Sequence, residues 1–192
     1  MNYIFDVGNV LVDYRPKKYL GSLFSDGELV EKLYTLVFGS PEWLEMDKGL
    51  LSFNNATEIF CSREPQYQKE IRTLMKHVNR IFDPIEETID LLPKIKEAGH
   101  SLYYLSNIQF EVRDYLLKTH DFFTMFDGGV FSCDINHIKP SPEIYRHLLK
   151  KYSLNPADCI FFDDMKENVT AAEKENIKSI LFTTPDCISE FI

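Results

Sequence analysis

The chain has 192 residues, enough for one domain with a full hydrophobic core or for a core domain with a small insert. Hydrophobic residues make up 44% and charged residues 27% of it, which is typical of a globular protein and excludes a disordered one. The formal net charge of −9, without any block of lysine or arginine, argues against a nucleic-acid-binding surface. To bind an anionic substrate, such a protein needs a metal ion or a lysine at the site itself.

The cysteines and the N-terminal residues predict an intracellular protein. The cysteines lie far apart and form no C-x-x-C pair, so neither a zinc site nor a disulfide framework is indicated: Cys61, Cys133, Cys159 and Cys187. Residues 1–6 include no basic region, and no apolar run is long enough for export or for a membrane span. We therefore expect a cytoplasmic protein with no membrane partner.

Five short apolar runs bounded by polar turns predict β-strands at residues 3–5, 102–105, 130–131, 159–162 and 179–182. Segments with helical spacing separate the last four runs, and this alternation predicts an α/β fold with a doubly wound, mainly parallel, Rossmann-like sheet. Gly99 and Asn176 follow two of the predicted helices, where a left-handed C-cap would suit. Pro93 predicts that the helix expected over residues 86–98 begins or kinks there.

Roughly half the chain lies between the first two strand runs, although a parallel crossover needs only about a dozen residues. Apolar residues in this stretch repeat at helical spacing in two groups: Leu29, Val30, Leu33, Leu36 and Val37, then Ile71, Leu74, Met75, Val78 and Ile81. We predict an inserted, all-helical cap at residues 14–83 and a core formed by residues 1–13 and 84–192. Trp43, which lies between the two groups, is expected to anchor the cap's own core rather than to contact substrate.

Polar residues follow the predicted strands, at the edge of a doubly wound sheet where functional groups gather. They are Asp6, the pair Ser106-Asn107, Lys139, the pair Asp163-Asp164 and, beyond them, Asn168. Carboxylates, a hydroxyl and a lysine at one sheet edge suit Mg²⁺ and a phosphate group. Taken singly, each also has a structural explanation, because aspartate and serine favour turns and helix caps and most lysines are solvated.

Four segments in this order carry a family resemblance: Phe5-Asp6-Val7-Gly8-Asn9-Val10-Leu11-Val12-Asp13, Leu105-Ser106-Asn107, Ile138-Lys139-Pro140 and Phe162-Asp163-Asp164-x-x-x-Asn168. Together they resemble the four motifs of the haloacid dehalogenase superfamily, in the form with a helical cap after the first motif. The D-x-G-N-V pattern of the first segment most resembles the branch that includes glucose-1-phosphate phosphatase.

The resemblance implies a covalent mechanism in which Asp6 attacks phosphorus, forms an aspartyl-phosphate and is released by water. It assigns Mg²⁺ to the side chains of Asp6 and Asp164 and to the Gly8 carbonyl, with Asp163 and Asn168 bracing these ligands. Phosphate and substrate binding fall to Gly8, Asn9, Ser106, Asn107 and Lys139, of which Lys139 also takes part in catalysis. The expected substrate is a small phosphorylated metabolite, such as a glycosyl 1-phosphate, bound by a monomer or a homodimer.

One position departs from the family pattern. Most phosphatases of the superfamily carry a second aspartate two residues after the nucleophile, where it protonates the leaving oxygen and later activates water. Here that position is Gly8. Either the leaving group is a comparatively acidic hydroxyl, such as an anomeric one, or a substrate or water group replaces the missing acid.

Two other functions remain open at this point. A haloacid dehalogenase uses the same nucleophile without a metal ion, and the acidic pair Asp163-Asp164 argues against it. A non-catalytic binding or regulatory protein is compatible with Gly8, whereas the retention of Asp6, Lys139 and Asp164 argues for an enzyme.

Overall fold

The computed structural model describes residues 1–192 and contains one central sheet of five parallel strands. In the order β5-β4-β1-β6-β7, the strands are β5 (Gly128–Phe131), β4 (Ser101–Ser106), β1 (Asn2–Phe5), β6 (Cys159–Asp163) and β7 (Lys178–Leu181). Each of the five predicted runs lies in or overlaps one of these strands. The predicted α/β fold is confirmed, and every strand pair in this sheet is parallel.

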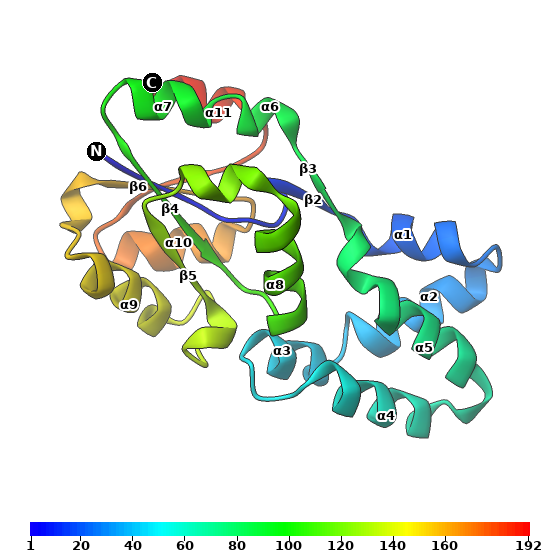
Figure 1. Ribbon diagram of the computed structural model, residues 1–192. Helices are drawn as coiled ribbons and strands as arrows, with labels where there is room; N and C mark the ends of the chain where they lie inside the picture. The colour runs from blue at the N-terminus through cyan, green and yellow to red at the C-terminus, as the bar shows by residue number, and fades with distance from the viewer.

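Helices cover both faces of the sheet, as a doubly wound fold requires. The helices over one face are α7 (Leu92–Glu97), α8 (Phe110–Thr119) and α11 (Asp186–Ser189), and those over the other are α9 (Pro142–Tyr152) and α10 (Lys166–Lys174) (Figure 1). Successive side chains of a strand point to opposite faces, so Tyr3 and Phe5 belong to the larger hydrophobic core and Ile4 to the smaller. This double burial explains why the strands appear in the sequence as continuous apolar runs.

The predicted helix ends are present. The segment containing Pro93 forms two short helices, α6 (Glu86–Ile89) and α7, and Pro93 lies in the first turn of α7. Gly99 has φ +82° and Asn176 has φ +62°, the left-handed conformation expected just after a helix. Five 3-10 helices complete the regular structure: η1 (Pro65–Tyr67), η2 (Val78–Ile81), η3 (Asp121–Met125), η4 (Ser132–Asp134) and η5 (Pro156–Asp158).

The insert after β1 is helical, and it is joined to the core by an antiparallel ribbon of β2 (Val12–Tyr14) and β3 (Phe82–Pro84). The α-helices between these strands are α1 (Pro16–Leu23), α2 (Gly27–Val37), α3 (Pro41–Asp47), α4 (Phe53–Arg63) and α5 (Gln68–His77). The side chains of Asp26, Ser40 and Ser52 cap α2, α3 and α4 by accepting hydrogen bonds from backbone amides.

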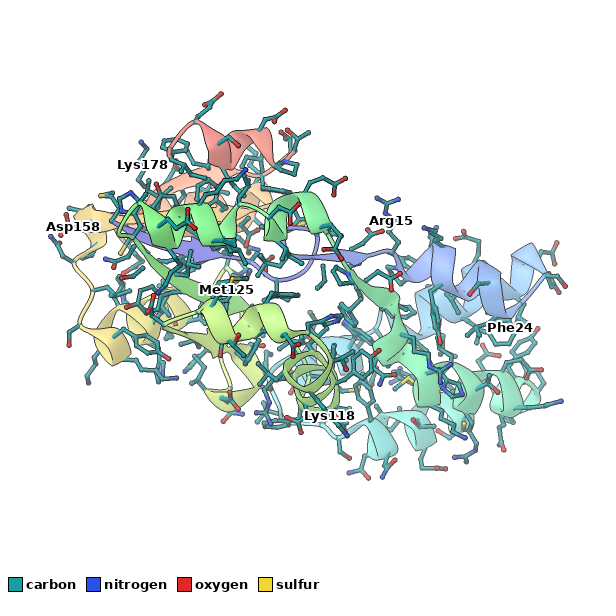
Figure 2. All side chains as sticks on the ribbon, turned by 45° about the horizontal axis from the view of Figure 1, so that its top comes forward. Arg15, Phe24, Lys118, Met125, Asp158 and Lys178 are labelled. Carbon is teal, nitrogen blue, oxygen red and sulfur yellow. The ribbon has the colours of Figure 1, made fainter.

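The helices of the insert form a lobe beside the sheet (Figure 1). Figure 2 shows Arg15 near the connection between the two lobes, Phe24 on the cap and Asp158 on the far side of the core. The short strands β2 and β3, of three residues each, were not among the predicted strands. The cap limits at residues 14 and 83 fall within this ribbon, and that division of the chain stays a prediction. No helix has the length and apolar character needed to cross a membrane.

Candidate active site

The predicted site residues converge at the carboxyl ends of the strands. A cavity of about 420 Å³ lies there, between the sheet edge and the cap. Eight of the nine predicted residues line it: Asp6, Gly8, Asn9, Ser106, Asn107, Lys139, Asp164 and Asn168. The ninth, Asp163, has no exposed surface and contacts the cavity residues Lys139 and Asn168 from beneath. The parallel topology brings these distant segments together because all five strands end at the same edge.

The carboxylate of Asp6, directly after β1, has one oxygen engaged and one free. Its Oδ1 accepts a hydrogen bond from the Val7 amide at 2.7 Å and lies 2.8 Å from Nζ of Lys139, whereas its Oδ2 has no partner in the protein. Burial raises the pKa of Asp6, and the Lys139 ammonium opposes this rise. The side chain is therefore held in one orientation and presents a single oxygen to the cavity.

Lys139 lies between two carboxylates. Its Nζ is 2.8 Å from Asp6 and 2.7 Å from Oδ2 of Asp163, and only 1% of the lysine side chain is exposed. Burial by itself lowers the pKa of Lys139, but attraction to Asp163 and Asp6 outweighs that effect, and the net shift is upward. The lysine is thus a fixed positive charge.

Asp163 is fully occupied by protein donors. Its oxygens accept from the Met165 amide at 2.8 Å, from Nδ2 of Asn168 at 2.9 and 3.1 Å, and from Lys139. Asp164, which is partly exposed, accepts one bond from Nδ2 of Asn9 at 2.9 Å. Asp163 therefore fixes its neighbours, while Asp164 keeps an oxygen available to the cavity.

The loop after β4 is tied to the segment carrying Lys139. The side chain of Asn107 donates to the Lys139 carbonyl at 2.9 Å and accepts from the Lys139 amide at 2.7 Å. Ser106 does not cap α8, whose N-cap residue is Gln109. The Ser106 hydroxyl makes only a 3.5 Å contact with the Asn107 carbonyl, so it can donate to another acceptor in the cavity.

The acidic groups fit a hard divalent cation. One carboxylate oxygen from each of Asp6, Asp163 and Asp164 lies within 4.8 Å of the other two. Repulsion from Asp163 and Asp164 adds to the raised pKa of Asp6, so these crowded carboxylates favour a neighbouring cation. Oxygen donors are what Mg²⁺ prefers, and Asp6 and Asp164 are the two with oxygens not taken by other side chains.

The cap side of the cavity was missed by sequence analysis. Four aromatic residues line it: Tyr14, Tyr34, Trp43 and Phe82. Trp43 is buried and packs on Phe38 with ring centroids 4.6 Å apart, as expected of a core anchor, but it also lines the cavity. No spacing in the sequence signals this, because each ring comes from a different element.

Two polar residues that line the cavity, Asp47 of the cap and Gln109 of the core, were also missed. Asp47, at the end of α3, accepts a 2.6 Å hydrogen bond at Oδ1 from Nε2 of Gln109. Burial raises the pKa of Asp47 to about 8. The only signal in the sequence was an aspartate just before the Lys48-Gly49 turn. His137, close to Lys139 in sequence, is exposed and does not line the cavity.

The chain is similar to known proteins in sequence and in fold. A model of the family described as haloacid dehalogenase-like hydrolase matches residues 47–182. The phosphorylated carbohydrates phosphatase of Thermotoga maritima is 29% identical over 92% of this chain and 82% of its own length. The sesquiterpene phosphatase astK of Aspergillus oryzae is 27% identical over 88% of this chain and 83% of its own.

Among solved structures, a HAD family enzyme from Bacteroides thetaiotaomicron, in complex with magnesium and inorganic phosphate, superposes with a TM-score of 0.75. The alignment covers 95% of this chain and 93% of that one at 21% identity. At this identity the likeness shows a shared fold.

Proposed function

Because this chain belongs to the haloacid dehalogenase-like hydrolase family, we propose that it is a Mg²⁺-dependent phosphatase of a small phosphorylated metabolite. The orientation of the Asp6 side chain is the main support for this proposal. Lys139 and the Val7 amide hold its Oδ1, and its free Oδ2 faces a cavity that also contains Ser106 and Asp164. A carboxylate fixed in this way is prepared for nucleophilic attack.

In the proposed reaction, Oδ2 of Asp6 attacks the phosphorus atom, and the bond to the leaving oxygen breaks. Lys139, the Ser106 hydroxyl and the Asn107 backbone hold the phosphate oxygens. Asp164 and the Gly8 carbonyl, together with the Asp6 carboxylate, would hold Mg²⁺, which would offset the negative charge of the phosphate and the nucleophile. Water then hydrolyses the aspartyl-phosphate and restores Asp6.

The proposed substrate is a sugar phosphate, with glycosyl 1-phosphates favoured. The carbohydrate-phosphatase name of the Thermotoga maritima relative supports it, as do the aromatic rings that line the cap side of the cavity, since such rings pack against the apolar faces of sugars. A monophosphate of a hydrocarbon alcohol is the second candidate, because 7 of the 17 lining residues are hydrophobic. The sesquiterpene phosphatase relative is consistent with that candidate.

A phosphate-release screen tests both the activity and the substrate class. The panel contains glycosyl phosphates, other sugar phosphates, nucleotides, acyl phosphates and prenyl monophosphates, each with Mg²⁺ and with a chelator. Asp6→Asn removes the nucleophile and should abolish release. Asp158→Asn is the matched control, because Asp158 is exposed on the far side of the core (Figure 2) and should leave the rate unchanged. Release that survives in Asp6→Asn would refute the proposal.

A further inference from the structure

We propose that Asp47 of the cap is the general acid and base of this reaction and performs the work that Gly8 cannot. The inference rests on the proposed phosphatase function. Asp47 and Asp6 line the same cavity from opposite lobes, Asp47 from α3 and Asp6 from the sheet edge. In an in-line displacement the leaving oxygen lies opposite the nucleophile. The leaving oxygen then points away from the sheet edge and toward the cap, where Asp47 lies.

The end of α3 is fixed against the core, so the position of Asp47 is defined. Its backbone carbonyl accepts a hydrogen bond from the buried Ser132 hydroxyl at 2.5 Å. Two residues on, Gly49 has φ +69° and approaches the core so closely that a Cβ there would lie 2.4 Å from the Cys133 carbonyl oxygen. In addition, Oδ1 of Asp47 accepts a hydrogen bond from Gln109, the N-cap residue of α8, which follows the Ser106-Asn107 segment.

The surroundings of Asp47 keep it protonated. Only 7% of the residue is exposed, and burial alone raises its pKa to about 8. The other titratable groups that line the cavity are Asp6, Tyr14, Tyr34, Lys139 and Asp164. The charged residues beside Asp47 on α3 and η4 form ion pairs with other residues: Glu42 with Arg63, Glu45 with Lys48 and Asp134 with Arg113. The Cys133 thiol of η4 is buried. At neutral pH Asp47 can therefore donate a proton.

Gln109 supplies an independent sign of a ligand. It is 3% exposed and lines the cavity, yet its Oε1 has no hydrogen-bond partner in the protein. Buried polar atoms are nearly always paired. A hydroxyl group on the substrate beside Asp47 would provide the missing donor.

Asp47 transfers a proton in each of the two steps of the reaction. As Asp6 bonds to phosphorus and the bond from phosphorus to the leaving oxygen breaks, the Asp47 carboxylic acid transfers its proton to that oxygen and becomes a carboxylate. The alcohol then departs. Water then attacks the phosphorus atom of the aspartyl-phosphate, and the Asp47 carboxylate takes one proton from that water molecule. The bond between phosphorus and the Asp6 oxygen breaks. Inorganic phosphate leaves, and both aspartates regain their starting states.

The test compares Asp47→Asn with wild type on two substrates. An alkyl phosphate needs a proton on its leaving oxygen, whereas p-nitrophenyl phosphate releases a stable anion. For the alkyl phosphate, kcat/KM should fall about 10²- to 10⁴-fold. With p-nitrophenyl phosphate the variant should release one nitrophenol per active site in a rapid burst and then turn over slowly, because the base that activates water is absent. Glu45→Gln is the matched control on the same helix, since its side chain is 43% exposed, and it should behave as wild type.

Equal losses on both substrates without a burst, or no loss at all, would overturn the role of Asp47. A wild-type protein that releases no phosphate with Mg²⁺ would instead refute the proposed function itself. The wild-type pH profile gives a second measurement that requires no variant. With the alkyl phosphate, kcat/KM should decline above about pH 8, where Asp47 loses its proton, and with p-nitrophenyl phosphate it should not. Identical profiles for the two substrates would contradict the assignment.

Discussion

Replacing Lys139 by methionine should destabilise the fold severely. The Lys139 ammonium is 2.8 Å from Asp6 and 2.7 Å from Asp163, and the exposed fractions of these three side chains are 1%, 11% and 0%. Lys139→Met keeps the length of the side chain but leaves two buried carboxylates without their cation. Removal of one partner from a buried ion pair typically costs about 3–5 kcal/mol. Since domains are stable by about 5–15 kcal/mol, this loss is a large fraction of the total stability.

Urea unfolding at neutral pH with a chelator present measures this loss without a contribution from bound metal. Lys118→Met is the control, because Lys118 is exposed near the end of α8 (Figure 2) and its loss should cost less than about 1 kcal/mol. A loss below about 1 kcal/mol for Lys139→Met would show that the two carboxylates do not depend on the lysine, and the electrostatic description of the site would be wrong.

Three further predictions concern pH, backbone conformation and the metal ion. Between pH 3.8 and about 8 folded Asp47 keeps a proton that the unfolded chain loses, so the free energy of unfolding falls as pH rises. In urea unfolding, the free energy of unfolding of Asp47→Asn relative to that of wild type should therefore rise by up to ~1.4 kcal/mol for each pH unit between about pH 5 and 7. If the unfolding free energies of the two proteins changed in parallel with pH, this prediction would be contradicted. Gly49→Ala should cost at least about 1–3 kcal/mol in the same assay, because φ is +69° and Phe110 and Cys133 leave no room for a Cβ. Gly21→Ala, within α1 and with nothing within 4 Å, should instead stabilise by about 0.5–1 kcal/mol, and equal effects would refute the steric argument. A chelator should abolish phosphate release and Mg²⁺ should restore it, whereas phosphate release that persists in the chelator would contradict the proposed dependence on Mg²⁺.

The core and its side of the site could be predicted because their signals are local. Each parallel strand is a continuous apolar run, and the residue after it points to the same sheet edge as its counterparts. The places of Asp6, Ser106 and Asp163 at the sheet edge follow from these local signals. The left-handed Gly99 and Asn176 likewise follow from helix-end chemistry that acts within a few residues.

The cap side could not be predicted, because it depends on how separate elements pack. Tyr14 comes from β2, Tyr34 from α2 and Asp47 from α3, and each has an ordinary local sequence. The pKa of Asp47 is raised only because α3 packs against η4 and Gln109, which buries the carboxyl group. The ribbon of β2 and β3 escaped notice because three residues are too few to show an alternating pattern.

The covalent role of Asp6 is tested most directly by detecting phosphate on Asp6 during turnover. Wild-type protein is mixed with Mg²⁺ and the best substrate from the screen, quenched rapidly in acid and digested for mass spectrometry. We expect phosphate on the peptide that contains Asp6, and none when a chelator replaces Mg²⁺ or when Asp6→Asn is used. Rapid Mg²⁺-dependent phosphate release by an Asp6→Asn protein, or phosphate mapped to another residue, would contradict it.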